Sequence, residues 1–202
     1  MRRYMLLSLA VLALSGAVTR AAPPVADPDW PCRQRLVPAL TAATFWNGTP
    51  LALEADWRAE PRVAAEVAAL APRDMPVEDG IARLGHFADG LNPVERATLL
   101  PELFAGLVDE TNRQRGDIIV RIKDLARRQH DLGATAAKVT AELRDAPAGD
   151  DDAKRREEIR QRRDFIIRSF EETERTMRYA CEVPVDLEAR LGGYARAVQS
   201  RL

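Results

Sequence analysis

The sequence has few of the side chains on which most enzyme active sites depend. Its 202 residues include two histidines, His86 and His130, and beyond residue 21 its only serines are Ser169 and Ser200. No G-x-S-x-G, H-E-x-x-H or paired E-x-x-H pattern occurs, and neither serine has a histidine nearby in the sequence. The sequence therefore lacks the usual signatures of serine hydrolases, zinc proteases and di-iron bundles. We expect a protein that is not an enzyme, with no catalytic residues and no cofactor.

A metal site is not expected either, although one pair of residues has a suitable spacing. His86 and Asp89 are three residues apart, which places two side chains on the same face of a helix. Leu84 and Phe87 surround His86, however, and a single histidine in such a setting is more often packed or at the surface than a metal ligand.

Lysine is scarce, and the total charge is nearly balanced. The chain has 30 basic residues, only three of them lysines, and 31 acidic residues. Loss of Arg2, Arg3 and Arg20 with the N-terminal leader leaves 27 basic residues and a net charge of about −4. A nucleic-acid-binding protein needs a net basic face to displace counterions from phosphates. We therefore expect no nucleic-acid partner.

The sequence has no long apolar run except at its N-terminus. Arg2 and Arg3 precede a mainly apolar run from Met5 to Leu14, and Thr19-Arg20-Ala21 follows as a cleavage site. A run of about ten residues is too short to cross a bilayer, which takes roughly 20. We expect a signal peptide over residues 1–21, cleaved near Ala21, a periplasmic or secreted protein, and no transmembrane segment after cleavage. A retained N-terminal anchor is the alternative.

The expected export bears on the two cysteines, Cys32 and Cys181, because an exported protein meets an oxidising environment. In an oxidising compartment they are the one pair available, so we predict a disulfide between them. The alternative is a metal or redox site, but no C-x-x-C is present and two distant cysteines would need histidine or carboxylate ligands as well.

One N-terminal segment resembles that of a group of uncharacterised exported bacterial proteins. The resemblance is carried by D-W-P-C at residues 29–32, Arg35, V-P at 37–38, Leu40, Trp46 and Gly48. It covers residues 29–48 and implies export and a cysteine held near the mature N-terminus. It implies no activity.

The pattern of apolar residues predicts an all-α fold: a small helical bundle with a long antiparallel, coiled-coil-like helical hairpin. From Ile118 to Leu143 apolar residues recur every 3.5 positions, and Ile159 to Met177 repeat the pattern after the polar loop 145–152. We expect an extended lead-in at 22–31, a helical body at 32–110, the hairpin at 111–183 and a C-terminal helix packed on the body at 184–202. Pro101 is expected to kink or restart its helix, and Val183-Pro184 to end the return limb.

Three consecutive apolar residues, Phe165, Ile166 and Ile167, suggest an interaction surface. They cover a wider arc of the helix than a two-helix hairpin can bury, so the body, a second copy or another protein should cover Phe165 and Ile167. We expect an exported scaffold, adaptor or chaperone-like protein that binds an unknown protein partner, or itself as a homodimer, through the hairpin. The alternative is a small-ligand or cofactor-binding protein that uses the tryptophan-rich N-terminal part.

Overall fold

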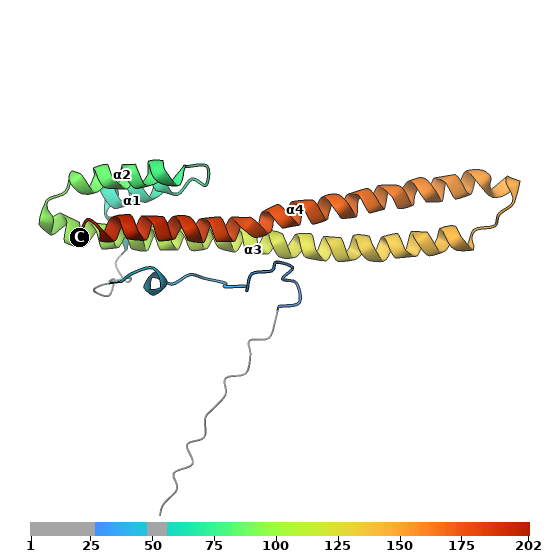
Figure 1. Cartoon of the computed structure of the whole chain (residues 1–202), viewed down its shortest axis with the longest axis horizontal. Coiled ribbons are helices and arrows are strands. Elements are labelled where there is room, and N and C mark those ends of the chain that lie inside the picture. Colours follow the sequence, from blue (N-terminus) through green and yellow to red (C-terminus); the bar gives the residue numbers. More distant parts are fainter. Residues whose placement is uncertain (1–26, 48–55) are drawn as a thin grey trace, which may run out of the picture.

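The computed structural model describes residues 27–47 and 56–202 (Figure 1). The expected signal peptide, residues 1–21, and the first part of the lead-in, residues 22–26, lie outside the described residues, as does Gly48. The described chain forms α1 (Pro61–Leu70), α2 (Val77–Asp89), α3 (Pro93–Asp145) and α4 (Ala153–Gln199), with short 3-10 turns η1 (Ala42–Thr44), η2 (Trp57–Ala59) and η3 (Asp150–Asp152). The described residues contain no strand, so the predicted all-α fold is confirmed.

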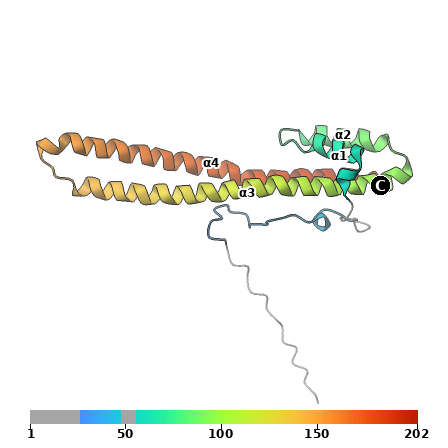
Figure 2. The same cartoon turned by 180° about the vertical axis from the view of Figure 1, so that it is seen from behind.

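The two long helices α3 and α4 form an antiparallel hairpin that runs the length of the molecule (Figures 1 and 2). The short helices α1 and α2 pack against one end of this hairpin and make the body. The opposite end is the arm, residues 128–174, which projects away from the body. The predicted hairpin is confirmed, and the turn between its helices lies where the polar loop 145–152 was expected.

Helices α1 and α3 begin at side chains that cap their N-termini, Glu60 and Asn92. Asn92 accepts hydrogen bonds from the backbone N–H of Val94 and Glu95, and the Glu95 carboxylate accepts one from the Asn92 N–H, which completes a capping box. Pro61 and Pro93 stand at first helical positions, where the missing N–H costs no hydrogen bond. Local sequence therefore determines the starts of α1 and α3.

The predicted end of the return limb at Val183-Pro184 is wrong, because Pro184 lies inside α4. Pro101 likewise lies inside α3, so that helix does not restart there. Each proline removes one hydrogen bond of its helix, but tertiary packing holds the helix on both sides of it. Leu100 and Leu103 around Pro101 are fully buried, and Pro184 is itself buried with its carbonyl bonded to Arg115. The return limb of the hairpin and the expected C-terminal helix are consequently one helix of 47 residues.

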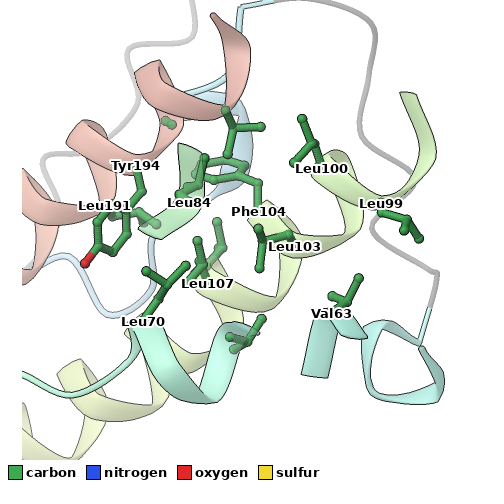
Figure 3. Close-up of a cluster of buried hydrophobic side chains, with 14 of the residues drawn as sticks. Val63, Leu70, Leu84, Leu99, Leu100, Leu103, Phe104, Leu107, Leu191 and Tyr194 are labelled. Carbon is green, nitrogen blue, oxygen red and sulfur yellow. The ribbon is translucent and has the colours of Figure 1, made fainter. Parts of the chain in front are cut away.

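The main hydrophobic core lies in the body, where α1 and α2 meet the adjoining ends of α3 and α4 (Figure 3). Phe104 and Tyr194 are its largest fully buried side chains, surrounded by leucines and valines from all four helices. The C-terminal part of α4 contributes four large side chains that are buried there: Leu187, Leu191, Tyr194 and Val198.

Residues 27–47, which we call the strap, run without a long helix along the hairpin and antiparallel to α3 (Figure 1). The strap begins where Asp27 pairs with Lys123 and passes Asn112, which exchanges two hydrogen bonds with the backbone of Leu40. It reaches the C-terminal end of α4, where the Asn47 N–H donates to Gln199. The strap therefore connects the base of the arm to the body.

Candidate functional site

The arm has a small hydrophobic core of its own. Val139, Ile159 and Ile166 are buried together across the hairpin, with partly buried apolar residues around them: Leu132, Ala136, Leu143 and Ala146. Val139 of α3 and Ile159 of α4 therefore share one buried cluster. Gly133 faces Phe170, whose Cε2 would lie 3.6 Å from a Cβ at that position.

The hairpin buries Ile166 and leaves the residues on both sides of it exposed. Ile166 is 8% exposed, whereas Phe165 is 64% and Ile167 is 39% exposed. Because consecutive helical residues are separated by about 100°, Phe165 and Ile167 lie on opposite flanks of α4 and do not form one patch. Phe165 is aligned at heptad spacing with Tyr179, which is 70% exposed, while Ile167 is aligned with Cys181 on the flank that carries the strap.

Charged side chains surround the exposed Phe165. Arg162 forms an ion pair with Glu142 across the hairpin, and Arg163 pairs with the adjacent Asp164. Arg168, one turn after Phe165, is exposed and has no ion pair with a described residue. Exposed pairs of this kind contribute little to stability.

Cys32 of the strap and Cys181 of α4 lie at disulfide distance, with Cα atoms 5.6 Å apart. The geometry is that of the predicted disulfide, which would join residues 149 positions apart. Gln34 strengthens the same junction, because its side-chain amide donates to the Cys181 carbonyl. The pair therefore attaches the strap at the base of the arm.

Arg115 of α3 connects the strap with α4 near the cysteine pair. Its guanidinium donates to the Pro184 carbonyl at 2.6 Å and to the Val37 carbonyl at 2.9 Å, and its nearest carboxylate, on Glu188, is 3.8 Å away. The side chain is buried, and this burial lowers the pKa of Arg115. Two backbone carbonyls thus replace most of the water that the cation loses.

Two ion pairs hold the beginning of the strap. Lys123 Nζ is 2.7 Å from the Asp27 carboxylate, and Arg127 Nη1 is 2.8 Å from that of Asp29. The hydrogen bond from Lys123 is the main reason that the pKa of Asp27 lies below its ordinary value, and the Asp29 N–H adds to it. The pKa of Arg127 is raised, chiefly by its hydrogen bond to Asp29.

The three tryptophans, which the ligand-binding alternative would use, have different neighbours. Trp30 Nε1 donates to the Gln34 carbonyl within the strap, and Trp46 stacks on Phe104 with ring centroids 5.3 Å apart. Trp57 donates to Asp109 of α3. The three rings therefore take part in separate structural contacts and do not form one aromatic site in the described chain. The ligand-binding alternative stays a prediction.

His86 and Asp89, the pair with metal-ligand spacing, have different neighbours in the structure. Asp89 forms an ion pair with Arg201, whereas His86 borders a shallow hollow of about 510 Å³ that also contains the ion pair of Glu66 with Arg83. In the described part of the chain, no three histidine, cysteine or acidic side chains converge as a metal site would require.

Comparison of the chain with protein-family models, curated proteins and solved structures finds no match. No helix in the described ranges is long and apolar enough to span a membrane.

Sequence reasoning did not find Arg115 or Asn112. Both lie in the polar stretch 111–116, which α3 crosses without interruption. The sequence does carry one indication of Arg115. It stands at the spacing of the apolar repeat that includes Phe104 and Ile118, a position that a solvated arginine would not normally occupy.

Proposed function

We propose that this is an exported interaction protein, a scaffold or adaptor, whose arm binds a partner protein through the outer face of α4. The observation that carries the proposal is the 64% exposure of Phe165 on an arm that has a core of its own. A large aromatic side chain in that position gains free energy when a partner removes it from water.

The shape of the arm supports the same conclusion. Beyond Arg127, the last α3 residue bonded to the strap, α3 continues to Asp145, which is about 27 Å at 1.5 Å per residue. A pair of helices of this length, joined at its base to the strap and the body, holds side chains far from the body in fixed positions. Such pre-organisation reduces the entropy that binding must overcome.

Export is part of the proposal. It is supported by the N-terminal pattern of Arg2, Arg3 and the apolar run Met5–Leu14, and by a cysteine pair at disulfide distance, which suits an oxidising compartment. The resemblance of residues 29–48 to uncharacterised exported proteins points the same way.

The proposal is tested by placing a photo-crosslinking amino acid at position 165 or 179 in cells that produce the protein. The matched control is position 120, because Val120 is a similarly exposed apolar residue, 58% exposed, on the outer face of α3. We expect adducts from positions 165 and 179 and none from position 120. Their mass identifies a second copy or another protein, and either one supports the proposal.

Two results would contradict the proposed function. Absence of any protein adduct from positions 165 and 179 would show that the outer face of α4 has no partner. Equal yields from all three positions would show that exposed side chains of this chain are captured without selection.

A further inference from the structure

We propose that Cys32–Cys181 is a reversible thiol–disulfide site, and that its reduction releases residues 27–37 of the strap while the helices stay folded. This inference goes beyond partner binding by the arm and does not depend on it.

The two halves of the strap are held in different ways. In the second half, Leu40 and Ala42 are buried, and Trp46 stacks on Phe104 of the core. In the first half, none of residues 27–37 is buried. The first half is held by the cysteine pair, the exposed or half-exposed ion pairs of Asp27 and Asp29, and the hydrogen bonds of Gln34 and Val37. Solvent screens such ion pairs, so the covalent bond carries most of the attachment.

The packing beneath the first half of the strap is incomplete. A cavity of about 80 Å³ lies between the strap and the helices, and its walls include Trp30, Val37, Arg115, Ile119 and Pro184. A segment that spans a void forfeits the close contacts that make an ordinary core rigid. Its removal therefore disturbs the α3–α4 interface little.

The cysteine pair is accessible from outside. Cys32 and Cys181 are both partly exposed and border an open hollow of about 560 Å³, together with Pro31, Glu174 and Met177. A thiol can therefore approach without unfolding of α3 or α4. Accessible disulfides of this kind are the ones that exchange readily with thiols, whereas deeply buried disulfides resist reduction.

The reaction requires a dithiol as reductant. One thiolate of the dithiol attacks a sulfur of the pair, so that the Cys32–Cys181 bond breaks and a mixed disulfide forms. The second thiol of the reductant then attacks that mixed disulfide and closes the reductant's own disulfide. Two electrons and two protons pass to the protein, which leaves Cys32 and Cys181 as thiols.

Release changes the surface at the base of the arm. Ile119, which is 9% exposed beneath the strap, becomes accessible, and Arg115 loses the Val37 carbonyl as an acceptor. The base of the arm then presents an apolar side chain beside a cation with a free donor, a surface that the oxidised protein does not have.

Limited trypsin digestion tests the inference, because the strap carries Arg33 and Arg35, both exposed. The exposed Arg155 near the tip of the arm serves as an internal control. The full-length mature protein is compared with and without dithiothreitol, and with a Cys32→Ser/Cys181→Ser variant. Thiol labelling counts free cysteines, circular dichroism at 222 nm follows the helices, and mass spectrometry follows each cleavage.

We expect dithiothreitol to yield two labelled thiols per chain with unchanged helical signal. Cleavage after Arg33 and Arg35 should accelerate about tenfold or more, both on reduction and in the serine variant, while cleavage after Arg155 keeps its rate. Thiols that appear only as the helical signal is lost would overturn the proposal. So would reduction that leaves strap cleavage unchanged, or a serine variant that is cleaved faster at every site, including Arg155.

Discussion

Two glycines of α3 allow one substitution to be tested in opposite surroundings. Gly106 lies in the body, where a Cβ would stand 2.6 Å from Val67 Cγ2 and 2.9 Å from Trp57 Cδ2. Gly116 lies where α3 leaves the body, and a Cβ there would have no neighbour within 4 Å. Neither glycine has a positive φ, so alanine fits the backbone at both positions.

The helix-propensity gain is the same at both sites, so any difference between them measures packing. Gly116→Ala should stabilise the protein by about 1 kcal/mol, the difference between glycine and alanine inside a helix. Gly106→Ala has the same gain but forces a methyl group into occupied space, which costs about 1–3 kcal/mol. We therefore expect the free energy of unfolding of the Gly106→Ala variant to be about 1–3 kcal/mol lower than that of the Gly116→Ala variant.

Urea unfolding followed by circular dichroism at 222 nm, with the cysteines oxidised, measures this difference. The comparison is valid if the dependence of the free energy on urea is equal for the variants, since the same surface is then exposed. Adding Val67→Ala to the Gly106→Ala protein makes room for the new methyl group, so the two losses should be less than additive. Equal stability of Gly106→Ala and Gly116→Ala would refute the packing of α3 against α1 described above.

Three further predictions follow from buried or paired groups. Tyr194→Phe should raise the free energy of unfolding by about 1 kcal/mol, because the buried Tyr194 hydroxyl has no hydrogen-bond partner among residues 27–47 and 56–202. Calorimetry or urea unfolding measures this, and a loss of stability would contradict it. Arg115→Met should lower the free energy of unfolding by about 2–4 kcal/mol, because two carbonyls lose a charged donor; an unchanged urea midpoint would mean that desolvation of the guanidinium cancels its hydrogen bonds. The pKa of Asp27 is depressed in the folded protein, so its contribution to stability is complete above its ordinary pKa of 3.8 and is lost as the pH falls through the lowered value. An NMR titration that finds the Asp27 carboxyl at or above 3.8 would contradict its pairing with Lys123.

The separation of the two cores has a consequence for the proposed binding function. The arm core of Val139, Ile159 and Ile166 is small, whereas the body core draws on all four helices. Changes at the exposed Phe165 should therefore alter partner binding without unfolding the body, because neither the body core nor the strap contacts depend on that side chain. A loss of binding in a surface variant of the arm can therefore be assigned to the lost side chain and not to unfolding of the body.

Local sequence was sufficient for most of the architecture. The capping box at Asn92, the prolines that start α1 and α3, and the apolar repeat after Ile118 predict helix starts and a hairpin, because these signals act within one or two turns. The cysteine pairing was also predictable, since an exported chain with two cysteines has one possible intramolecular pair. The exposure of Phe165 and Ile167 followed from helix geometry, since one packed face cannot cover three consecutive residues.

The sequence by itself thus determined the fold class, the hairpin and its turn, and the exposed apolar residues of the arm. Only the tertiary structure decided that α3 and α4 continue through Pro101 and Pro184, that Arg115 joins three segments, and that the strap lies along the hairpin. The physical reason is that these features depend on contacts between residues far apart in the sequence. A proline's local preference to break a helix costs only a few kcal/mol, and burial of leucines from distant segments exceeds it. The acceptors of Arg115 lie 69 and 78 residues away along the chain, so no local pattern could reveal them.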